Sequence, residues 1–305
     1  MLIECVPNFS EGRNLTCIDA IYEAISRVAG ILVLHRTSDP DHNRTVITFA
    51  GGREEVIEAA VRAADAAGRL IDLNHHRGVH PRLGAMDVLP FVPLEGATLD
   101  LCADVAHQAG ARIWNELGIP VYFYQAAATR PDRIQLEDVR RGQFEYLREA
   151  VLMDETKQPD LGGPFLHPTA GAIAVGARKL LIAYNINLDS TDLELAKLIA
   201  KRIRTSSGGF PAVKALGLPL ESRGLVQVSM NLTDFAQTPP HVVYAEVSRL
   251  AAAHGVQIAE SELIGLMPRR AIEMAAADLL KLSSFDSECV IENRIQILRS
   301  ASYSV

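Results

Sequence analysis

Strand-like and helix-like segments alternate along almost the whole chain, and this alternation constrains the fold more than any other feature. The chain begins in the order strand, helix, strand, strand, helix, strand. The strands are predicted at 2–9, 31–38, 44–51 and 85–94, and the helices at 14–30 and 53–71. The polar stretch DPDHN between the second and third strands predicts a hairpin. This order is typical of an α/β chain whose antiparallel or mixed sheet carries helices on one face.

The alternation continues over most of the remaining chain. Further strands are predicted at 119–127, within 170–188, and at 224–235 and 256–268; further helices are predicted at 98–118, 136–152, 190–203, 239–255 and 269–282. Segment 170–188 holds either two strands or one strand bent at Gly176. The helix at 190–203 is expected to begin at Ser190 or Thr191, with Glu194 completing a capping box. The segment after Cys289 is weakly patterned.

We therefore expect two tightly packed subdomains in an α+β sandwich. Each is predicted to be of ferredoxin-like type, a mixed β-sheet with helices on one face. The boundary is placed near residue 178, which gives subdomains at 1–178 and 179–298 and a tail at 299–305. Because no low-complexity linker separates the subdomains, a cleft between them is the first place to expect a ligand.

Composition narrows the functional class. The 305 residues are 48% hydrophobic with a formal net charge of −7, which supports a sizeable core and argues against general affinity for nucleic acid or anionic membranes. The four cysteines form no CxxC pair, so buried thiols in a reducing compartment are expected. The N-terminus lacks a signal-peptide pattern, and no apolar run approaches the ~20 residues of a membrane span. We expect a cytoplasmic protein.

Common nucleotide-binding, serine-hydrolase and metalloprotease signatures are absent, and three unusual polar segments remain. The first is SDPDHNRTV at 38–46. Its Asp, Pro and Asn residues suit a hairpin turn. Asp39, Asp41 and His42 can also be considered as metal ligands, although one loop seldom supplies enough convergent groups. A third possibility is that one aspartate orients a histidine elsewhere in the chain.

The second segment, GVHPRLGAMD at 78–87, places His80 before a proline at the start of an apolar strand. Histidine titrates near neutral pH, and the following proline favours an extended backbone at His80. Gly84 permits a close approach of another backbone. These features fit a fixed general base at a strand entrance and fit a structural loop equally well.

The third segment, 159–188, is rich in glycine and small residues and offers room for a flat ligand against the backbone. Arg178 and Lys179 can meet a carboxylate there. The alternative is a small-residue strand packed under a helix, with both cations in solvent.

Taken together, the segments resemble the glutamate formiminotransferase family. The matching pieces occur in the family's order: ECVPNFSEGRN at 4–14, DPDHNRTVITFAGG at 39–52, HPRLGAMDVLPFVP at 80–93, GARKLLIAYNINL at 176–188, VSMNLTDF at 228–235 and ESELIGLMP at 260–268. They cover essentially the whole chain. The cyclodeaminase domain that follows in the vertebrate enzymes is missing from these 305 residues, so that second activity is expected to be absent.

The resemblance implies a homodimer with a folate tunnel between the two subdomains. His80 corresponds to the family's catalytic histidine, and Asp39 to the aspartate that assists it. The implied folate contacts lie in the glycine-rich stretch, at Gly162, Gly163, Pro164, Phe165, His167, Thr169, Ala170 and Gly171. Segment 205–218 is the least similar to the family. It either closes over the substrate with Lys214 or forms an exposed loop.

The implied reaction moves the formimino group of N-formimino-L-glutamate to N5 of tetrahydrofolate in histidine degradation. One histidine can accept the N5 proton and then protonate the leaving nitrogen, so no metal is required. The glutamate carboxylates need cationic partners, and Arg44, Arg82 and Arg178 are the candidates. The alternatives are a glutamate formyltransferase that uses N-formylglutamate or 5-formyltetrahydrofolate, a non-catalytic folate-binding protein, and, last, a structural α/β interaction protein.

Overall fold

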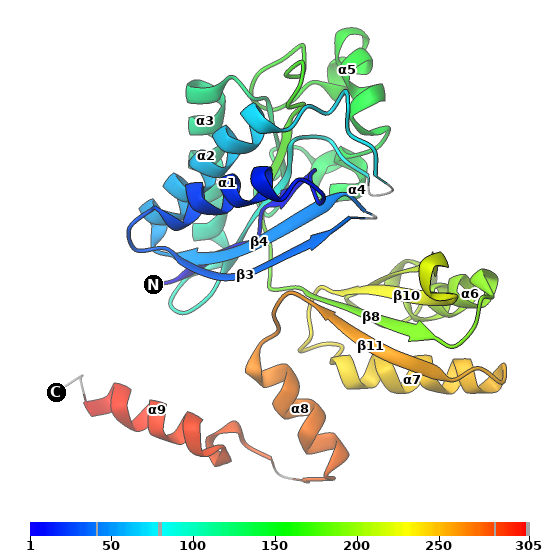
Figure 1. Cartoon of the computed structure of the whole chain (residues 1–305). Helices are drawn as coiled ribbons and strands as arrows, with labels where there is room; N and C mark the ends of the chain where they lie inside the picture. Colours follow the sequence, from blue (N-terminus) through cyan, green and yellow to red (C-terminus); the bar gives the residue numbers. More distant parts are fainter. Residues whose placement is uncertain (41, 79–80, 284, 303–305) are drawn as a thin grey trace. The chain divides into compact units, whose positions relative to one another are not determined.

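The computed structural model describes residues 1–40, 42–78, 81–283 and 285–302 of the chain (Figure 1). The chain divides into two compact units, Met1–Leu180 and Leu181–Val305. Each unit contains one β-sheet with helices packed on it, which confirms the predicted fold class. None of the helices in these ranges combines the length and apolar character that a membrane crossing requires.

The first unit is built on a mixed seven-stranded sheet. Its strands are β1 (Ile3–Cys5), β2 (Asn8–Phe9), β3 (Leu32–Asp39), β4 (Arg44–Gly51), β5 (Met86–Pro93), β6 (Val121–Gln125) and β7 (Ile173–Ala177). The expected hairpin is the antiparallel pair of β3 and β4. The short strands β1 and β2 both lie between β4 and β5 and pair antiparallel with each. The strand β7 lies between β5 and β6 and runs parallel to both.

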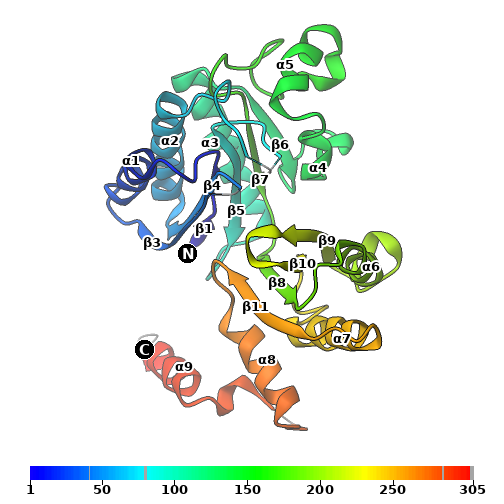
Figure 2. The ribbon, with the colours of Figure 1, turned by 45° about the vertical axis from the view of Figure 1, so that its right-hand side comes forward.

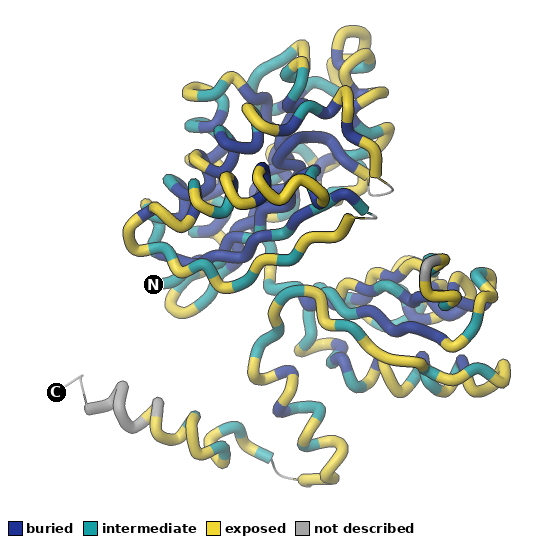
Figure 3. Tube along the Cα trace, viewed as in Figure 1, coloured by how far each residue is buried: buried dark blue, intermediate teal, exposed yellow. Residues whose placement is uncertain are grey.

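The three longest helices of the first unit pack on its sheet, and the buried residues of the sheet and helices form its core (Figures 2 and 3). They are α1 (Leu15–Ser26), α2 (Arg53–Leu70) and α3 (Leu99–Leu117). The buried positions of α1 recur at helical spacing, from Ile18 through Ile21 to Ile25, as expected for an amphipathic helix with one face against a sheet. Alanine predominates on the buried face of α2, which lets the neighbouring helices pack closely.

The single helix predicted at 136–152 is wrong, because two helices form there. They are α4 (Leu136–Val139) and α5 (Gln143–Met153). The break lies at Gly142, whose φ of 88° is in the left-handed region that glycine adopts without strain. The break places Arg140 beside Asp87, while Glu145 of α5 pairs with Arg82. The helix break at Gly142, which the helical periodicity did not indicate, is therefore accompanied by ion pairs to residues outside the two helices.

The second unit has a four-stranded antiparallel sheet in the order β11-β8-β10-β9. Its strands are β8 (Ile182–Leu188), β9 (Val213–Leu220), β10 (Leu225–Leu232) and β11 (Ile258–Ile264); its helices are α6 (Leu193–Ile203), α7 (Pro240–Ala253), α8 (Arg269–Leu279) and α9 (Ile291–Ser302). The helices α6 and α7 pack against each other and against the sheet. A mixed sheet was expected here, but every strand pair described is antiparallel.

Two local predictions in the second unit need correction. Segment 205–218 is not simply an exposed loop, because most of it lies in the short helix η3 (Thr205–Ser207) and in β9. The N-cap of α6 is Asp192, whose carboxylate accepts the amides of Glu194 and Leu195, so the cap lies beyond Ser190 and Thr191. Among the described residues, the first unit also has the single-turn 3-10 helices η1 (Pro131–Arg133) and η2 (Glu155–Lys157), and the second has η4 (Glu221–Arg223) and η5 (Ser287–Cys289).

Candidate active site

Three loops of the first unit meet with their backbones in close contact at one end of β2, β4 and β5. A side-chain Cβ at Gly12 would lie 2.3 Å from the carbonyl oxygen of Asp39 and 2.5 Å from the amide nitrogen of Arg44. A Cβ at Gly78 would lie 2.4 Å from the carbonyl oxygen of His42. Because all three distances are far below van der Waals contact, glycine is required for these loops to approach each other.

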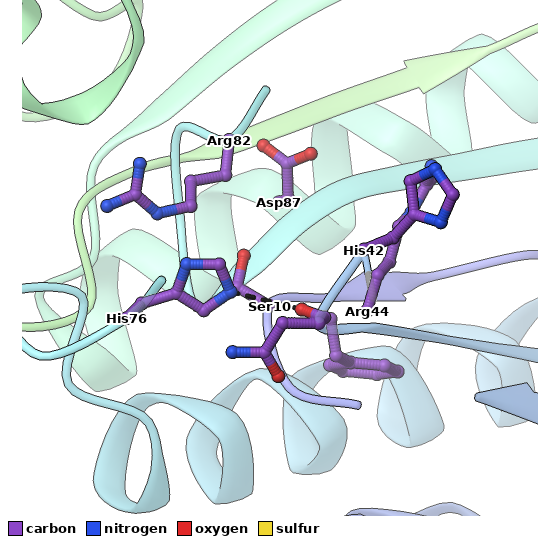
Figure 4. A pocket seen from close by; sticks show the side chains of 8 residues that line it. Ser10, His42, Arg44, His76, Arg82 and Asp87 are labelled. Atoms are coloured by element: carbon purple, nitrogen blue, oxygen red, sulfur yellow. Dashed lines mark hydrogen bonds between the residues drawn. The ribbon is translucent and has the colours of Figure 1, made fainter. Parts of the chain in front are cut away.

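A small pocket, with a cavity volume of about 10 Å³, lies where these loops meet. Figure 4 shows His76 and Arg82 on one side of it and His42 and Arg44 on the other. Its lining residues are Phe9, Ser10, His42, Asn43, Arg44, His76, Arg82 and Asp87. With two arginines and one carboxylate in its lining, the pocket is suited to an anionic group.

Asp39 ends β3 at the edge of this region and forms a pair with His42. The ring nitrogen Nδ1 of His42 lies 2.6 Å from Oδ2 of Asp39, and the backbone amide of His42 donates to Oδ1 at 2.9 Å. The carboxylate therefore orients an imidazole of its own turn, whereas the sequence suggested a histidine elsewhere in the chain. His80 lies outside the described residues, so the structure does not address the expected pair of His80 and Asp39.

Asp87 is the carboxylate of the pocket and lies at a β-bulge. The register between β2 and β5 passes from Val88 to Met86, which leaves Asp87 as the extra residue. Bulges of this kind turn a side chain out of the regular alternation of a strand. Asp87 is only 3% exposed; it accepts the amide of Leu83 at 2.7 Å and forms an ion pair with Arg140. It therefore fixes the segment before β5 and neutralises a nearby cation.

The three candidate carboxylate ligands have different surroundings. Arg44 donates to the side chain of Asn8, and burial lowers its pKa to about 10, with Arg140 acting in the same direction. Arg82 is buried, and its guanidinium lies 2.5 Å from a carboxylate oxygen of Glu145. Both line the pocket.

Arg178 is not among the pocket's lining residues. Its amide donates to the carbonyl of Phe91 at 3.0 Å, near the far end of β5 from Asp87. There its guanidinium lies close to Glu4 and Tyr124. Burial raises the pKa of Tyr124 to about 12 and also raises that of Glu4, and Arg178 partly offsets both increases.

The glycine-rich segment runs alongside the strand entrance. The amide of Ala85 donates to the carbonyl of Ala170 at 2.9 Å, and Gly84 and Gly171 form a β-bridge. A Cβ at Gly84 would lie 2.0 Å from the carbonyl oxygen of Ala172, so the close approach predicted for Gly84 is present. The segment implied for folate thus contacts the strand entrance of the pocket directly.

Within the glycine-rich segment, individual residues differ in exposure and support. His167 accepts the amide of Ala170 at 3.0 Å through Nδ1, and burial lowers its pKa. Gly162 has a φ of 92°, and a Cβ there would lie 3.0 Å from the ring of Trp114. Phe165 is exposed. The ring of Trp114 therefore forms part of the support for the start of this segment.

The other chemistry considered from the sequence is a metal site. Among the residues described, no three His, Cys, Asp or Glu side chains converge as metal ligands would. Asp41, one of the three candidates, lies outside them.

Comparison with known families agrees with the arrangement of these motifs. Residues 2–178 match the model of the "Formiminotransferase domain, N-terminal subdomain", and residues 183–298 match that of the "Formiminotransferase domain". The chain belongs to the formiminotransferase family. The two matched regions fall on the two compact units of this formiminotransferase.

Relatives of known name are similar to this formiminotransferase over nearly its whole length. The glutamate formimidoyltransferase of Thermoplasma acidophilum is 43% identical and covers 97% of each chain. That of Streptococcus pyogenes serotype M1 is 41% identical and covers 96% of this chain and 98% of its own. The formimidoyltransferase-cyclodeaminase of Sus scrofa is 44% identical over 90% of this chain, which spans 52% of that relative. The chain is therefore a transferase.

The formiminotransferase pocket includes residues that the sequence did not single out. Asn43, His76 and Asp87 line it, and Arg140 supports it from α4. Asp87 and Asn43 lie within the matched motifs, but no pattern distinguishes them from their neighbours there. The available signal for His76 was its position four residues before His80.

The second unit of the formiminotransferase carries a polar cluster that sequence reasoning also missed. Arg223 forms ion pairs with Glu260 at 2.6 Å and with Glu262 at 3.0 Å. Both carboxylates accept from the side chain of buried Asn187, which in turn accepts from Gln227 at 2.9 Å. The cluster joins β8, β10 and β11, and its mutual bonds are those of a structural network.

Proposed function

We propose that this chain transfers the formimino group of N-formimino-L-glutamate to N5 of tetrahydrofolate and releases glutamate. The observation that carries the proposal is the hydrogen bonding of the glycine-rich segment to the strand entrance that follows the HPRLG motif. The amide of Ala172 donates to the carbonyl of Leu83 at 3.2 Å, and that of Ala85 to Ala170 at 2.9 Å. A folate held along 162–171 would thus lie next to the pocket. Relatives of nearly full length bear the name glutamate formimidoyltransferase.

The proposed chemistry needs two proton transfers. N5 becomes acidic as it attacks the formimino carbon, and a base accepts its proton as the tetrahedral intermediate forms. The departing glutamate nitrogen then needs a proton. We assign both steps to His80, because one imidazole can accept and donate near neutral pH. Asp39 would stabilise the imidazolium electrostatically. Tetrahydrofolate acts as a co-substrate, and the scheme requires no metal.

We further propose that Arg44 is the main partner of a glutamate carboxylate. Arg82 shares the pocket, but both of its terminal nitrogens already donate to the Glu145 carboxylate, which offsets its charge. Arg178 lies at the other end of β5 and is proposed for a separate carboxylate. Burial and nearby Arg140 lower the pKa of the Arg44 guanidinium, whereas Asp87 and Asp39 raise it. We also propose that the chain acts in histidine degradation in the cytoplasm and that it is a homodimer. Its proposed subdomains are 1–178 and 179–298.

The test is a turnover assay on the purified full chain. N-formiminoglutamate and N-formylglutamate are each supplied with tetrahydrofolate, with 5-formyltetrahydrofolate and glutamate tested in a parallel reaction. Release of glutamate from N-formiminoglutamate is expected, with at least about 100-fold less turnover in His80→Ala. The matched control is His75→Ala, which removes a neighbouring exposed imidazole. Turnover only with a formyl donor, or normal turnover in His80→Ala, would contradict the proposal.

A further inference from the structure

Two buried residues of the pocket have no part in the proposed proton transfers. Asn43 and His76 are each 7% exposed. Asn43 lies in the turn between β3 and β4 with a φ of 48°, a left-handed conformation that asparagine tolerates better than most residues. His76 lies in the loop between α2 and β5. The question is why polar side chains are buried at this junction.

Asn43 bonds to two other loops at three separate points. Its Oδ1 accepts the amide of Gly12 at 2.8 Å, and its Nδ2 donates to the carbonyl of Arg77 at 3.1 Å. Its own carbonyl lies 3.0 Å from Nε2 of His76. These partners are more than 30 residues away along the chain, so the bonds tie distant segments together.

The bond between His76 and Asn43 fixes the tautomer of the imidazole. A carbonyl can only accept, so Nε2 carries the hydrogen and Nδ1 holds the lone pair. Nδ1 is buried and has no hydrogen-bond partner among the residues described. Burial lowers the pKa of His76, and nearby Arg82 and Arg13 act in the same direction. The ring is therefore a neutral donor suited to holding a backbone carbonyl.

The turn that His76 holds carries the two groups whose position matters most for the proposed reaction. Asp39 and Arg44 face each other in the β3–β4 register, at the two ends of the turn. A shift of Asn43 would therefore displace the carboxylate and the guanidinium together. A misplacement of about 1 Å can reduce the rate of an enzyme about 100-fold.

We propose that Asn43 and His76 are positioning residues that hold Asp39 and Arg44 in register with the loop between α2 and β5. The effect on catalysis rests on the proposed function, whereas the hydrogen bond itself does not. The donor at Nε2 is the feature that matters. A glutamine places its amide nitrogen close to the position of Nε2, and an asparagine is too short to do so.

The experiment compares His76→Gln with His76→Asn in the full chain, with His75→Asn as the exposed control. For His76→Asn, kcat with N-formiminoglutamate is expected to fall between about tenfold and 100-fold, while the KM for tetrahydrofolate stays nearly constant. His76→Gln is expected to recover kcat to within about threefold of the parent. Hydrogen exchange of the peptide that contains Gly12 and of the β3–β4 peptide is expected to quicken about fivefold in His76→Asn only.

Each outcome decides the proposal. Equal kcat and equal exchange in His76→Asn and the parent would overturn it, and so would a failure of glutamine to restore both quantities. An inactive parent chain would refute the proposed function while the exchange comparison still tests the hydrogen bond. Asn43→Gly provides a second route, because glycine accepts the φ of 48° but loses both side-chain bonds. Its kcat is expected to fall like that of His76→Asn, and an unchanged kcat would count against the role of Asn43.

Discussion

Replacing Asp87 by asparagine should destabilise the first unit strongly, although it removes only a charge. The asparagine carbonyl can still accept the amide of Leu83, so the loss falls on the ion pair with Arg140. The side chains of Arg140 and Asp87 are only 13% and 4% exposed, and removal of one partner of a buried pair costs about 3–5 kcal/mol. Because Arg140 retains some contact with water, we expect about 3 kcal/mol for Asp87→Asn. Asp87→Ala also leaves the Leu83 amide unsatisfied and should cost about 1–3 kcal/mol more.

The single tryptophan of the chain, Trp114 in α3, provides the assay. Its fluorescence during urea unfolding reports on the first unit separately from the second. With a slope of about 2 kcal/mol per molar, a loss of about 3 kcal/mol lowers the midpoint by about 1.5 M. The control is Asp138→Asn, which breaks an exposed pair with Arg141 and should cost no more than about 1 kcal/mol.

A double variant makes the test stricter. Arg140→Gln combined with Asp87→Asn removes both charges, so it should be less destabilised than the sum of the two single variants. The reasoning would be refuted if Asp87→Asn cost less than about 1 kcal/mol, or if the two changes were simply additive.

Three further predictions follow from single positions. Gly162→Ala should destabilise the first unit and alter the fluorescence of Trp114, because the added Cβ would lie 3.0 Å from that ring. The control for backbone strain alone is Gly118→Ala, since Gly118 also has a positive φ but no neighbour within 4 Å of an added Cβ. The free energy of unfolding should fall as the pH drops below about 6.5. Burial lowers the pKa of His76 and His167 in the folded chain, so the unfolded chain binds more protons than the folded one in this range. Urea midpoints between about pH 7.5 and 5.5 measure this change. His76→Gln should flatten that slope, and an unchanged slope would assign it to other groups.

The regular elements were predictable where one periodicity dominates. The helix expected at 53–71 is α2 at Arg53–Leu70, because its apolar positions form one continuous stripe against the sheet. The strand β9 was missed, since Gly217 and Pro219 lower the strand propensity of Val213–Leu220. Both residues fit the folded structure. β9 lies at the edge of its sheet, where proline is tolerated, and a Cβ at Gly217 would lie 2.3 Å from the backbone nitrogen of Lys197 in α6.

The site was predictable only in part, for a different reason. Asp39, Arg44 and Arg82 were chosen from local patterns or from the family, and the structure places all three at one end of the sheet. The partners of these residues come from distant segments that one sequence does not connect. Glu145, the partner of Arg82, and Arg140, the partner of Asp87, lie on either side of the helix break at Gly142. The helical periodicity of the sequence did not indicate this break.

The partners also change how the arginines should be interpreted. In a single sequence, all arginines near a motif are equal candidates for an anionic substrate. In the folded unit, Glu145 offsets the charge of Arg82 and Asp87 offsets that of Arg140. Arg44 differs, because burial and Arg140 lower its pKa to about 10 and outweigh Asp87 and Asp39, which act in the opposite direction. A substrate carboxylate beside this buried guanidinium would stabilise its positive charge. Because Glu145 already offsets the charge of Arg82, Arg44 gains more from an anion, which is the physical basis for ranking it first.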